Sequence, residues 1–504
     1  NNKFNIENEE VPMRRINPKE RMFKNRDEEI IYTGDRGYKL ADVFENKVKL
    51  DDFVAQLSYN DLICMFRGEG MCSPKVTPGT AAAFGGITES LRNFGIPVAC
   101  CADGPSGIRM DCGTNAFSLP NGTALGCTFN VDLVKKLYKM TGIELCRNKI
   151  DSLLGPGMNI HRNPLNGRNF EYVSEDPILT GKIGAAQVIG IQEAGSTATI
   201  KHVCANNQEA SRRFVDSIVS ERALREIYLK GFEIAVKEGK ARSVMTTYNP
   251  VNGIWTAGSY DLCTTILRKE WGFDGIVMTD WWAEANTEGE KSTRENKAPM
   301  VLAQNDLYMC VSNSLENPEN DNVKERFEAG EVTRSDLQRN AKNILKFIMK
   351  SQAMLHELNL ISKEDLEEIN GQDDDGNISL EDIVYYYADK DSNDIIIDAS
   401  NFNNKKGDSE VFGISLNELG LYNIEITMKS EQGSLSQLPL SIYYDNALKS
   451  TITIRGTEGE WVTESRELGF IFGVNHYIKL YFGASGLDID KVVIKFMGKG
   501  KLPF

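Results

Sequence analysis

Short apolar runs alternate with amphipathic stretches between Leu50 and about Met354. The apolar runs, which are typical of buried strands, are Ile96–Ala102, Ser152–Ile160, Thr197–His202, Arg242–Tyr248 and Gly275–Asp280. Apolar positions at helical spacing recur between them, in Asn130–Cys146, Ile178–Ala194, Ser220–Lys237 and Tyr260–Glu270. Strands that alternate with helices predict parallel βα units. A stretch of about 300 residues built this way favours an eight-stranded TIM-type (β/α)8 barrel. A doubly wound sheet is less favoured, because no GxGxxG loop follows the first strand.

From residue 395 onward the period of the apolar positions changes to two. Alternating runs such as Tyr422–Met428 and Leu438–Tyr444 are separated by Gly, Asn and Asp turns, which predicts an all-β sandwich of jelly-roll type. We therefore expect four segments: an extension (1–49), the barrel (50–354), a helical, acidic connector (355–394) and the sandwich (395–504). In the connector, residues 371–382 weakly resemble a calcium loop. Gly371 and Asp382 stand where Asp and Glu are expected, so a solvated turn is the main interpretation.

The composition excludes several classes of function. Acidic residues outnumber basic ones, 72 to 57, and the net charge of −15 argues against nucleic-acid binding. No apolar run approaches the roughly 18 residues that span a bilayer, and no secretion signal is visible. The ten cysteines include no CxxC pair, and the four histidines are scattered. We therefore expect free thiols, a cytoplasmic location, and neither a metal nor a cofactor.

Polar side chains follow the predicted strands where each strand ends. These are Asp103 with Arg109, Arg168 with Glu171, Lys201 with His202, Tyr248 with Asn249, and Asp280, which Trp281 and Trp282 follow. In a barrel the carboxyl ends of the strands meet at one face, so these groups should surround one site. Acids, amides and guanidinium groups beside indoles suit a sugar ring. The structural alternatives are Asp280 as a helix cap, Lys201-His202 as a surface pair, Arg168–Glu171 as a salt bridge, and Met245 as core.

These residues carry a family resemblance. Asp103–Arg109, Gly167–Glu171 followed by Ser174–Pro177, Lys201-His202 and Val277–Trp281 resemble, in order, glycoside hydrolase family 3 in its β-glucosidase branch. Lys201-His202 continues as Val203-Cys204-Ala205, which disfavours the N-acetylglucosaminidase branch. The resemblance extends over about residues 50–350. The β-sandwich loosely resembles a carbohydrate-binding module.

The resemblance implies a role for each site residue. Asp280 would be the nucleophile of a retaining β-glucosidase that hydrolyses terminal, non-reducing β-D-glucosyl residues, and Trp281 the aromatic group beside it. The glycone would be held by Asp103, Arg109, Arg168, Lys201, His202, Met245 and Tyr248. Asp103 would hold hydroxyls at the far side of the ring, which favours glucose over xylose.

The sequence departs from the family pattern in one respect. Most members have an α/β sandwich domain that supplies the acid/base glutamate, and this chain passes from barrel to connector to β-sandwich. We expect inverted domain order, with the acid/base on a missing upstream domain or a partner chain. Glu171, Glu175 and Glu209 are poorer candidates for that role. A β-xylosidase of the same family and a non-catalytic carbohydrate-binding protein are the alternatives, and the sequence leaves open whether the chain forms a homo-oligomer.

Overall fold

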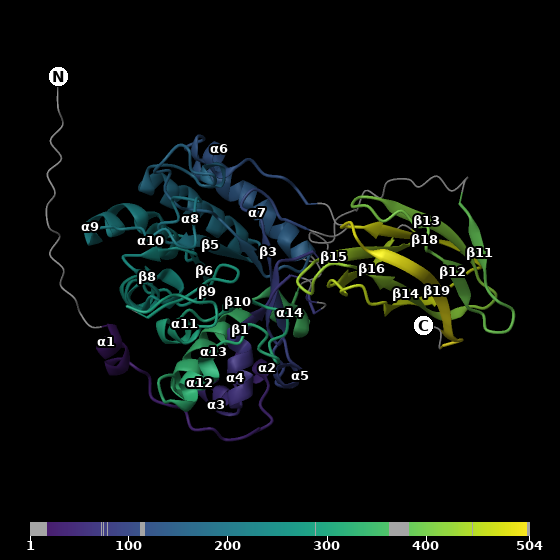
Figure 1. Cartoon of the computed structure of the whole chain (residues 1–504), viewed down its shortest axis with the longest axis horizontal. Coiled ribbons are helices and arrows are strands. Elements are labelled where there is room, and N and C mark those ends of the chain that lie inside the picture. The colour runs from purple at the N-terminus through teal and green to yellow at the C-terminus, as the bar shows by residue number, and fades with distance from the viewer. Residues whose placement is uncertain are drawn as a thin grey trace.

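The computed structural model describes residues 18–71, 73, 75–77, 79–110, 116–287, 289–361, 383–445 and 447–500. They form a barrel of strands and helices and, beside it, a body made only of strands (Figure 1). Residues 371–382, where the sequence weakly resembles a calcium loop, lie outside the described residues.

Eight strands form the barrel, and each is short and buried. They are β1 (Arg67–Glu69), β2 (Ala82–Gly85), β3 (Val98–Asp103), β4 (Ser152–Leu154), β5 (Thr197–Val203), β6 (Ser243–Thr246), β9 (Ile276–Met278) and β10 (Tyr308–Val311). Their order is β10-β1-β2-β3-β4-β5-β6-β9, and a parallel bridge between Met278 and Leu307 joins the two ends. The prediction of a TIM-type barrel is confirmed.

One strand runs against the expected direction. β2 pairs antiparallel with both β1 and β3, whereas every other pair in this sheet is parallel. Among the described residues, no helix lies between β1 and β2, and only the short α5 (Glu89–Asn93) lies between β2 and β3. A parallel crossover usually includes a helix that packs across the sheet, and these two connections, with no helix or only the short α5, reverse the chain instead.

Helices surround the barrel on its outer face (Figure 1). Besides α5, the α-helices of the described residues are α1 (Pro18–Lys24), α2 (Leu40–Phe44), α3 (Leu50–Ala55), α4 (Tyr59–Phe66), α6 (Gly122–Gly126), α7 (Val131–Arg147), α8 (Pro177–Glu193), α9 (Glu221–Ala223), α10 (Lys230–Lys237), α11 (Ala298–Ala303), α12 (Val323–Glu328), α13 (Arg334–Ile348) and α14 (Gln352–Glu357). Leu224–Tyr228 and Asp261–Glu270 are wound as π-helices, and Asn169–Glu171 and Thr256–Gly258 as 3₁₀-helices. None of the helices within the described ranges has the length and apolar character needed to cross a membrane.

The longest helices follow local sequence signals. Asn130 caps α7 and Asp176 caps α8, each by accepting backbone N–H bonds, and Pro177 opens α8 where a missing N–H costs least. A Cβ at Gly190 would lie 2.4 Å from the carbonyl oxygen of Lys135, so α8 approaches α7 at a separation that only glycine permits.

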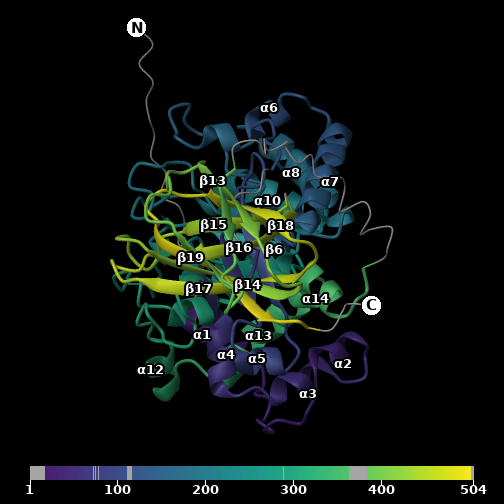
Figure 2. The same ribbon diagram turned by 90° about the vertical axis from the view of Figure 1, so that its right-hand side faces the viewer.

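The second body is a sandwich of two sheets. One sheet has the order β11-β13-β18-β15-β16 and the other β12-β19-β14-β17. Their strands are β11 (Tyr385–Tyr387), β12 (Ile395–Asp398), β13 (Ser409–Ser415), β14 (Gly420–Lys429), β15 (Leu438–Tyr444), β16 (Ala447–Ile454), β17 (Val462–Ile471), β18 (Asn475–Phe482) and β19 (Asp488–Gly498). Alternate residues of β14, namely Tyr422, Ile424, Ile426 and Met428, are buried, as the period of two predicts. The prediction of an all-β domain is confirmed, and Figure 2 shows its strands in front of the barrel.

A buried carboxylate joins the start of α14 to the barrel. Asp151, 2% exposed, accepts the N–H of Ala353 through Oδ1 and that of Cys100 through Oδ2, both at 2.8 Å. Burial raises the pKa of Asp151 to about 6, although these hydrogen bonds and one from Ser351 oppose the rise.

This raised pKa makes the stability of the barrel depend on pH. The folded chain keeps the proton on Asp151 up to about pH 6, whereas the unfolded chain releases it near 3.8. The free energy of unfolding should therefore fall as pH rises through this window, by up to about 3 kcal/mol from this group. Urea unfolding between about pH 4 and pH 7, followed by tryptophan fluorescence, should show this slope in the wild type and not in Asp151→Asn.

Asp132→Asn is the matched control, because Asp132 is exposed on α7 and should leave the slope unchanged. Identical slopes in the wild type and Asp151→Asn would contradict the assignment.

Candidate active site

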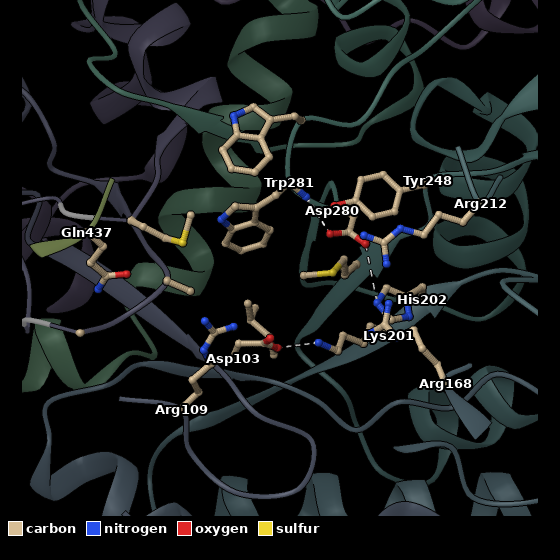
Figure 3. Close-up of a pocket in the computed structure, with 16 residues that line it drawn as sticks. Asp103, Arg109, Arg168, Lys201, His202, Arg212, Tyr248, Asp280, Trp281 and Gln437 are labelled. Atoms are coloured by element: carbon tan, nitrogen blue, oxygen red, sulfur yellow. Dashed lines mark hydrogen bonds and ion pairs between the residues drawn. The ribbon is translucent and has the colours of Figure 1, made fainter. Parts of the chain in front are cut away.

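A cavity of about 290 Å³ lies at the carboxyl ends of the barrel strands. Every residue to which the family resemblance gives a role lines it: Asp103, Arg109, Arg168, Lys201, His202, Met245, Tyr248, Asp280 and Trp281 (Figure 3). Glu171, also at a predicted strand end, does not line it. They come from the ends of β3, β5, β6 and β9 and from the loops that follow β3 and β4. The barrel thus collects residues from a long stretch of chain at one face, as the strand endings predict.

Asp103 ends β3 and is followed by a turn that only glycine permits. Gly104 has φ of +136°, and a Cβ there would lie 1.7 Å from the carbonyl oxygen of Gly107. Because of this turn, the backbone N–H of Arg109 donates a hydrogen bond to the carbonyl oxygen of Asp103 at 2.8 Å. Asp103 and Arg109 therefore line the same cavity from one short segment.

Lys201 forms the central ion pair of the cavity. Its Nζ lies 2.7 Å from Oδ1 of Asp103, and its side chain is 4% exposed. Burial alone would raise the pKa of Asp103. The charge and hydrogen bond of Lys201, the N–H of Gly104 and the charge of Arg168 outweigh this and lower that pKa. Asp103 is thus held as a carboxylate.

His202 is a neutral imidazole whose ring is held in place. Burial, together with the charges of Arg168, Lys201 and Arg212, lowers the pKa of His202. The hydroxyl of Tyr172 lies 3.4 Å from Nδ1 and accepts a bond from Asn206 at 2.9 Å. We assign the ring proton to Nε2, because Nε2 lies 3.7 Å from the acceptor Oδ2 of Asp280.

Asp280 lies just beyond β9, and its side chain is 13% exposed. Burial raises its pKa, while the charges of Lys201 and Arg168, the N–H of Trp281 and the hydroxyl of Tyr248 act against that rise. The N–H of Trp281 donates to Oδ1 at 2.7 Å. Oδ2 faces the imidazole of His202. The helix-cap alternative does not hold, because no helix starts at Trp281 and the carboxylate lines the cavity.

The carboxylates beside the cavity are already paired. Glu171 accepts Nε of Arg168 at 2.6 Å, and Glu209 accepts Arg212 at 3.0 Å and Asn206 at 3.0 Å. Among the described residues that line the cavity, the carboxylates are Asp103 and Asp280. Arg168 therefore has both of the roles considered from the sequence: it forms a salt bridge and it lines the cavity.

Trp282, which also follows the predicted strand end, lines the cavity too, and the cavity contains residues that the sequence did not indicate: Met71, Gly79, Ala81, Leu154, Arg212 and Gln437. Arg212 lies 4.8 Å from the ring centroid of Tyr248. It lies in the loop after β5, where two consecutive arginines follow the Asn206–Ala210 segment, so charge at a strand end could have indicated it. Gln437 belongs to the β-sandwich, and no local signal links it to the barrel.

Removal of the buried cation should cost stability. Lys201→Met leaves Asp103 without its partner, and loss of one member of a buried pair is strongly destabilising. The side chain of Asp103 is 40% exposed, so water offsets part of the loss. We expect the free energy of unfolding, measured with urea, to fall by about 1–3 kcal/mol.

Lys182→Met is the control, since Lys182 pairs with Glu238 at 2.6 Å where both side chains are about half exposed. That variant should lose less than about 1 kcal/mol. Equal losses of unfolding free energy in the two variants would contradict the conclusion that Lys201 forms a buried, stabilising ion pair.

Comparisons with known proteins show which family the chain resembles. Residues 75–347 match the family described as Glycosyl hydrolase family 3 N terminal domain. A β-glucosidase of Ruminococcus albus is 50% identical over 487 residues, which are 97% of this chain and 51% of that protein. The crystal structure of a β-glucosidase from Paenibacillus barengoltzii has a TM-score of 0.69 at 46% identity, covering 96% of this chain and 51% of that one. β-Glucosidase 3B from Thermotoga neapolitana, solved in complex with glucose, has a TM-score of 0.55 at 37% identity, covering 62% and 44%.

The chain thus spans about half the length of the relatives it matches. The family match covers more than half of this chain and includes every predicted strand end from Asp103 to Trp281. The resemblance seen in the sequence is confirmed. The chain belongs to glycosyl hydrolase family 3.

Proposed function

We propose that this chain carries the nucleophile and the glycone site of a retaining β-glucosidase that acts on terminal, non-reducing β-D-glucosyl residues. The observation that carries the proposal is Asp280, a buried carboxylate at a strand end that opens onto a cavity of sugar-binding groups. The β-glucosidases among its relatives, one of them solved with glucose, support the choice of sugar.

In the first step, Asp280 attacks the anomeric carbon and the bond from that carbon to the leaving oxygen breaks. The product is a covalent glycosyl ester on Asp280, which water then hydrolyses with net retention. Attack needs an ionised carboxylate. The charges of Lys201 and Arg168 and the hydrogen bond from Tyr248 favour the ionised form and limit the rise in the pKa of Asp280 that burial causes.

The remaining groups hold the sugar while charge develops on its ring. Asp103 accepts hydrogen bonds from sugar hydroxyls, and the guanidinium of Arg168 donates to them from a fixed fork. The Nε2 proton of His202 is available for a sugar oxygen near Asp280. Trp281 gives the ring an apolar face. Contacts that tighten in the oxocarbenium-like transition state lower the barrier. Contacts that are equally strong in the bound substrate and in the transition state only improve binding.

Retention also requires a second carboxyl group, about 5–5.5 Å from the nucleophile, as acid and then base. Asp103 is paired with Lys201, and Glu171 and Glu209 with arginines, so none is suited to hold the proton that an acid must give up. We propose that the acid/base comes from a part of the protein outside this chain. The relatives, which are about twice as long, have room for such a part.

The dependence of the reaction rate on the leaving group tests the proposal that the nucleophile lies on this chain and the acid/base outside it. Dinitrophenolate departs without protonation, so this chain should release it from 2,4-dinitrophenyl β-D-glucoside in a burst of one equivalent. Added azide should then speed turnover, because azide attacks the intermediate without a base. Cellobiose, whose leaving group needs a proton, should react about 10²–10⁴-fold more slowly than with an intact acid.

Asp280→Asn should abolish the burst, and Asp132→Asn, an exposed acid on α7, should retain it. A burst of wild-type size in Asp280→Asn would overturn the assignment of the nucleophile. Cellobiose hydrolysis as fast as that of the dinitrophenyl glucoside would place an acid on this chain. Glucose binding without any burst would favour the non-catalytic alternative.

A further inference from the structure

Asp280 begins a tight turn whose third residue has an unfavourable backbone conformation. The N–H of Ala283 donates to the carbonyl oxygen of Asp280 at 3.3 Å, which closes the turn. The third residue, Trp282, has φ of 56°. Turns with positive φ at this position usually have glycine or asparagine there, and a bulky side chain adopts it only at a cost in free energy. Such a residue persists where neighbouring groups hold it in place.

Two hydrogen bonds hold the backbone of Trp282. Its N–H donates to the carbonyl oxygen of Met309 in β10 at 2.7 Å, and its carbonyl oxygen accepts Nη1 of Arg213 at 3.1 Å. Among the described residues, Arg213 is the one whose side chain bonds to this backbone. Arg213 lies in the loop after β5, so its guanidinium joins that loop to the turn that carries Asp280.

The same guanidinium lies beside the ring of Tyr248. Its Cζ is 4.6 Å from the ring centroid, a distance at which a cation is attracted to the ring. Arg212 lies 4.8 Å from the same centroid and is paired with Glu209. Among the described residues, no carboxylate forms an ion pair with Arg213. The hydroxyl of Tyr248 in turn bonds to the carboxylate of Asp280, and Figure 3 shows these two side chains next to each other.

Arg213 is itself anchored. Its carbonyl oxygen accepts Nε1 of Trp255 at 3.1 Å, and the next residue, Phe214, donates its N–H to the carbonyl oxygen of Ser211 at 2.8 Å. A guanidinium is planar, so it can cover a ring with its face while an N–H at its edge donates to a carbonyl oxygen. One fixed side chain thus contacts both the Asp280 turn and the tyrosine that bonds to Asp280.

We propose that Arg213 is a positioning residue that holds the Asp280 turn and the Tyr248 ring against each other, so that the phenol hydroxyl stays bonded to the attacking carboxylate. This inference rests on the proposed function, which makes Asp280 the nucleophile. Arg213 is not among the described residues that line the cavity, so it acts through Asp280 and Tyr248 and not on the sugar. Precise placement matters, because a shift of about 1 Å at a reacting group can cost about 10²-fold in rate.

Loss of Arg213 should also make Asp280 harder to ionise. Burial raises the pKa of Asp280, and the hydroxyl of Tyr248 is one of the groups that oppose this rise. A loosened Tyr248 would leave the pKa of Asp280 higher, so the acidic limb of the rate profile should move to higher pH. The other charged or titratable groups around Asp280 stay in place, namely Arg168, Lys201, His202 and Arg212.

The burst of dinitrophenolate from 2,4-dinitrophenyl β-D-glucoside, followed by stopped flow on the whole chain, tests the inference. In Arg213→Met the rate constant of the burst should fall about ten- to hundredfold, and its acidic limb should move to higher pH. The amplitude should stay near one equivalent. Glucose binding, measured by isothermal titration, should change by less than about threefold, because Arg213 does not contact the sugar.

Two further variants separate positioning from a purely structural role. Arg213→Lys keeps the charge but cannot both cover the ring and donate to Trp282, so its rate constant should be intermediate, and it replaces the methionine variant if that one folds poorly. In a Tyr248→Phe background, which lacks the hydroxyl, Arg213→Met should move the acidic limb no further. Arg222→Met is the matched control, since the side chain of Arg222 on α9 is 84% exposed, and it should behave as the wild type.

An unchanged rate constant in both Arg213→Met and Arg213→Lys would overturn the inference. A smaller amplitude with an unchanged rate constant and pH profile would also overturn it, because Arg213 would then only stabilise the fold. The same holds if Arg213→Met moves the acidic limb equally with and without the Tyr248 hydroxyl. Absence of a burst in the wild type would instead overturn the proposed function.

Discussion

The Nζ of Lys201 lies where almost no water reaches it, 2.7 Å from Asp103, and its charge also acts on Asp280. Two carboxylates in one poorly solvated cavity repel each other and favour protonation. A protonated Asp280 could not attack carbon, and a protonated Asp103 would lose the charge that strengthens its bonds to hydroxyls. The charge of the buried cation favours the carboxylate form of both acids, and the guanidinium of Arg168 adds to its effect.

The barrel makes this balance of charges possible. Asp103, Lys201 and Asp280 are far apart in the sequence, yet each lies at or just beyond the carboxyl end of a strand. Parallel pairing of β3, β4, β5, β6 and β9 brings those ends to one face. The apolar strands below exclude water and so strengthen each electrostatic contact above them. The sandwich then adds Gln437 from the side, in a wall that the barrel leaves open.

The strand endings were predictable because each polar group directly follows an apolar run, and that change in polarity is local in the sequence. The direction of β2 was not predictable, since its run Ala82–Gly85 is only four residues long and direction depends on its connections. β1 was not predictable either, because it begins with a charged residue, Arg67. That residue is buried by pairing with Asp321, and the sequence does not show this pairing. Gln437 was also missed, because a contact between two domains leaves no period or motif in either segment.

The central claim is that the carboxylate of Asp280 forms a bond to the anomeric carbon. It is tested most directly with 2,4-dinitrophenyl 2-deoxy-2-fluoro-β-D-glucoside, since the fluorine slows hydrolysis of the ester and the dinitrophenolate leaves without an acid. Incubation of the chain with this reagent, followed by peptide mass mapping, should find one fluoroglucosyl group per chain, located on Asp280. A label on another carboxylate, or release of dinitrophenolate without any label, would contradict the account.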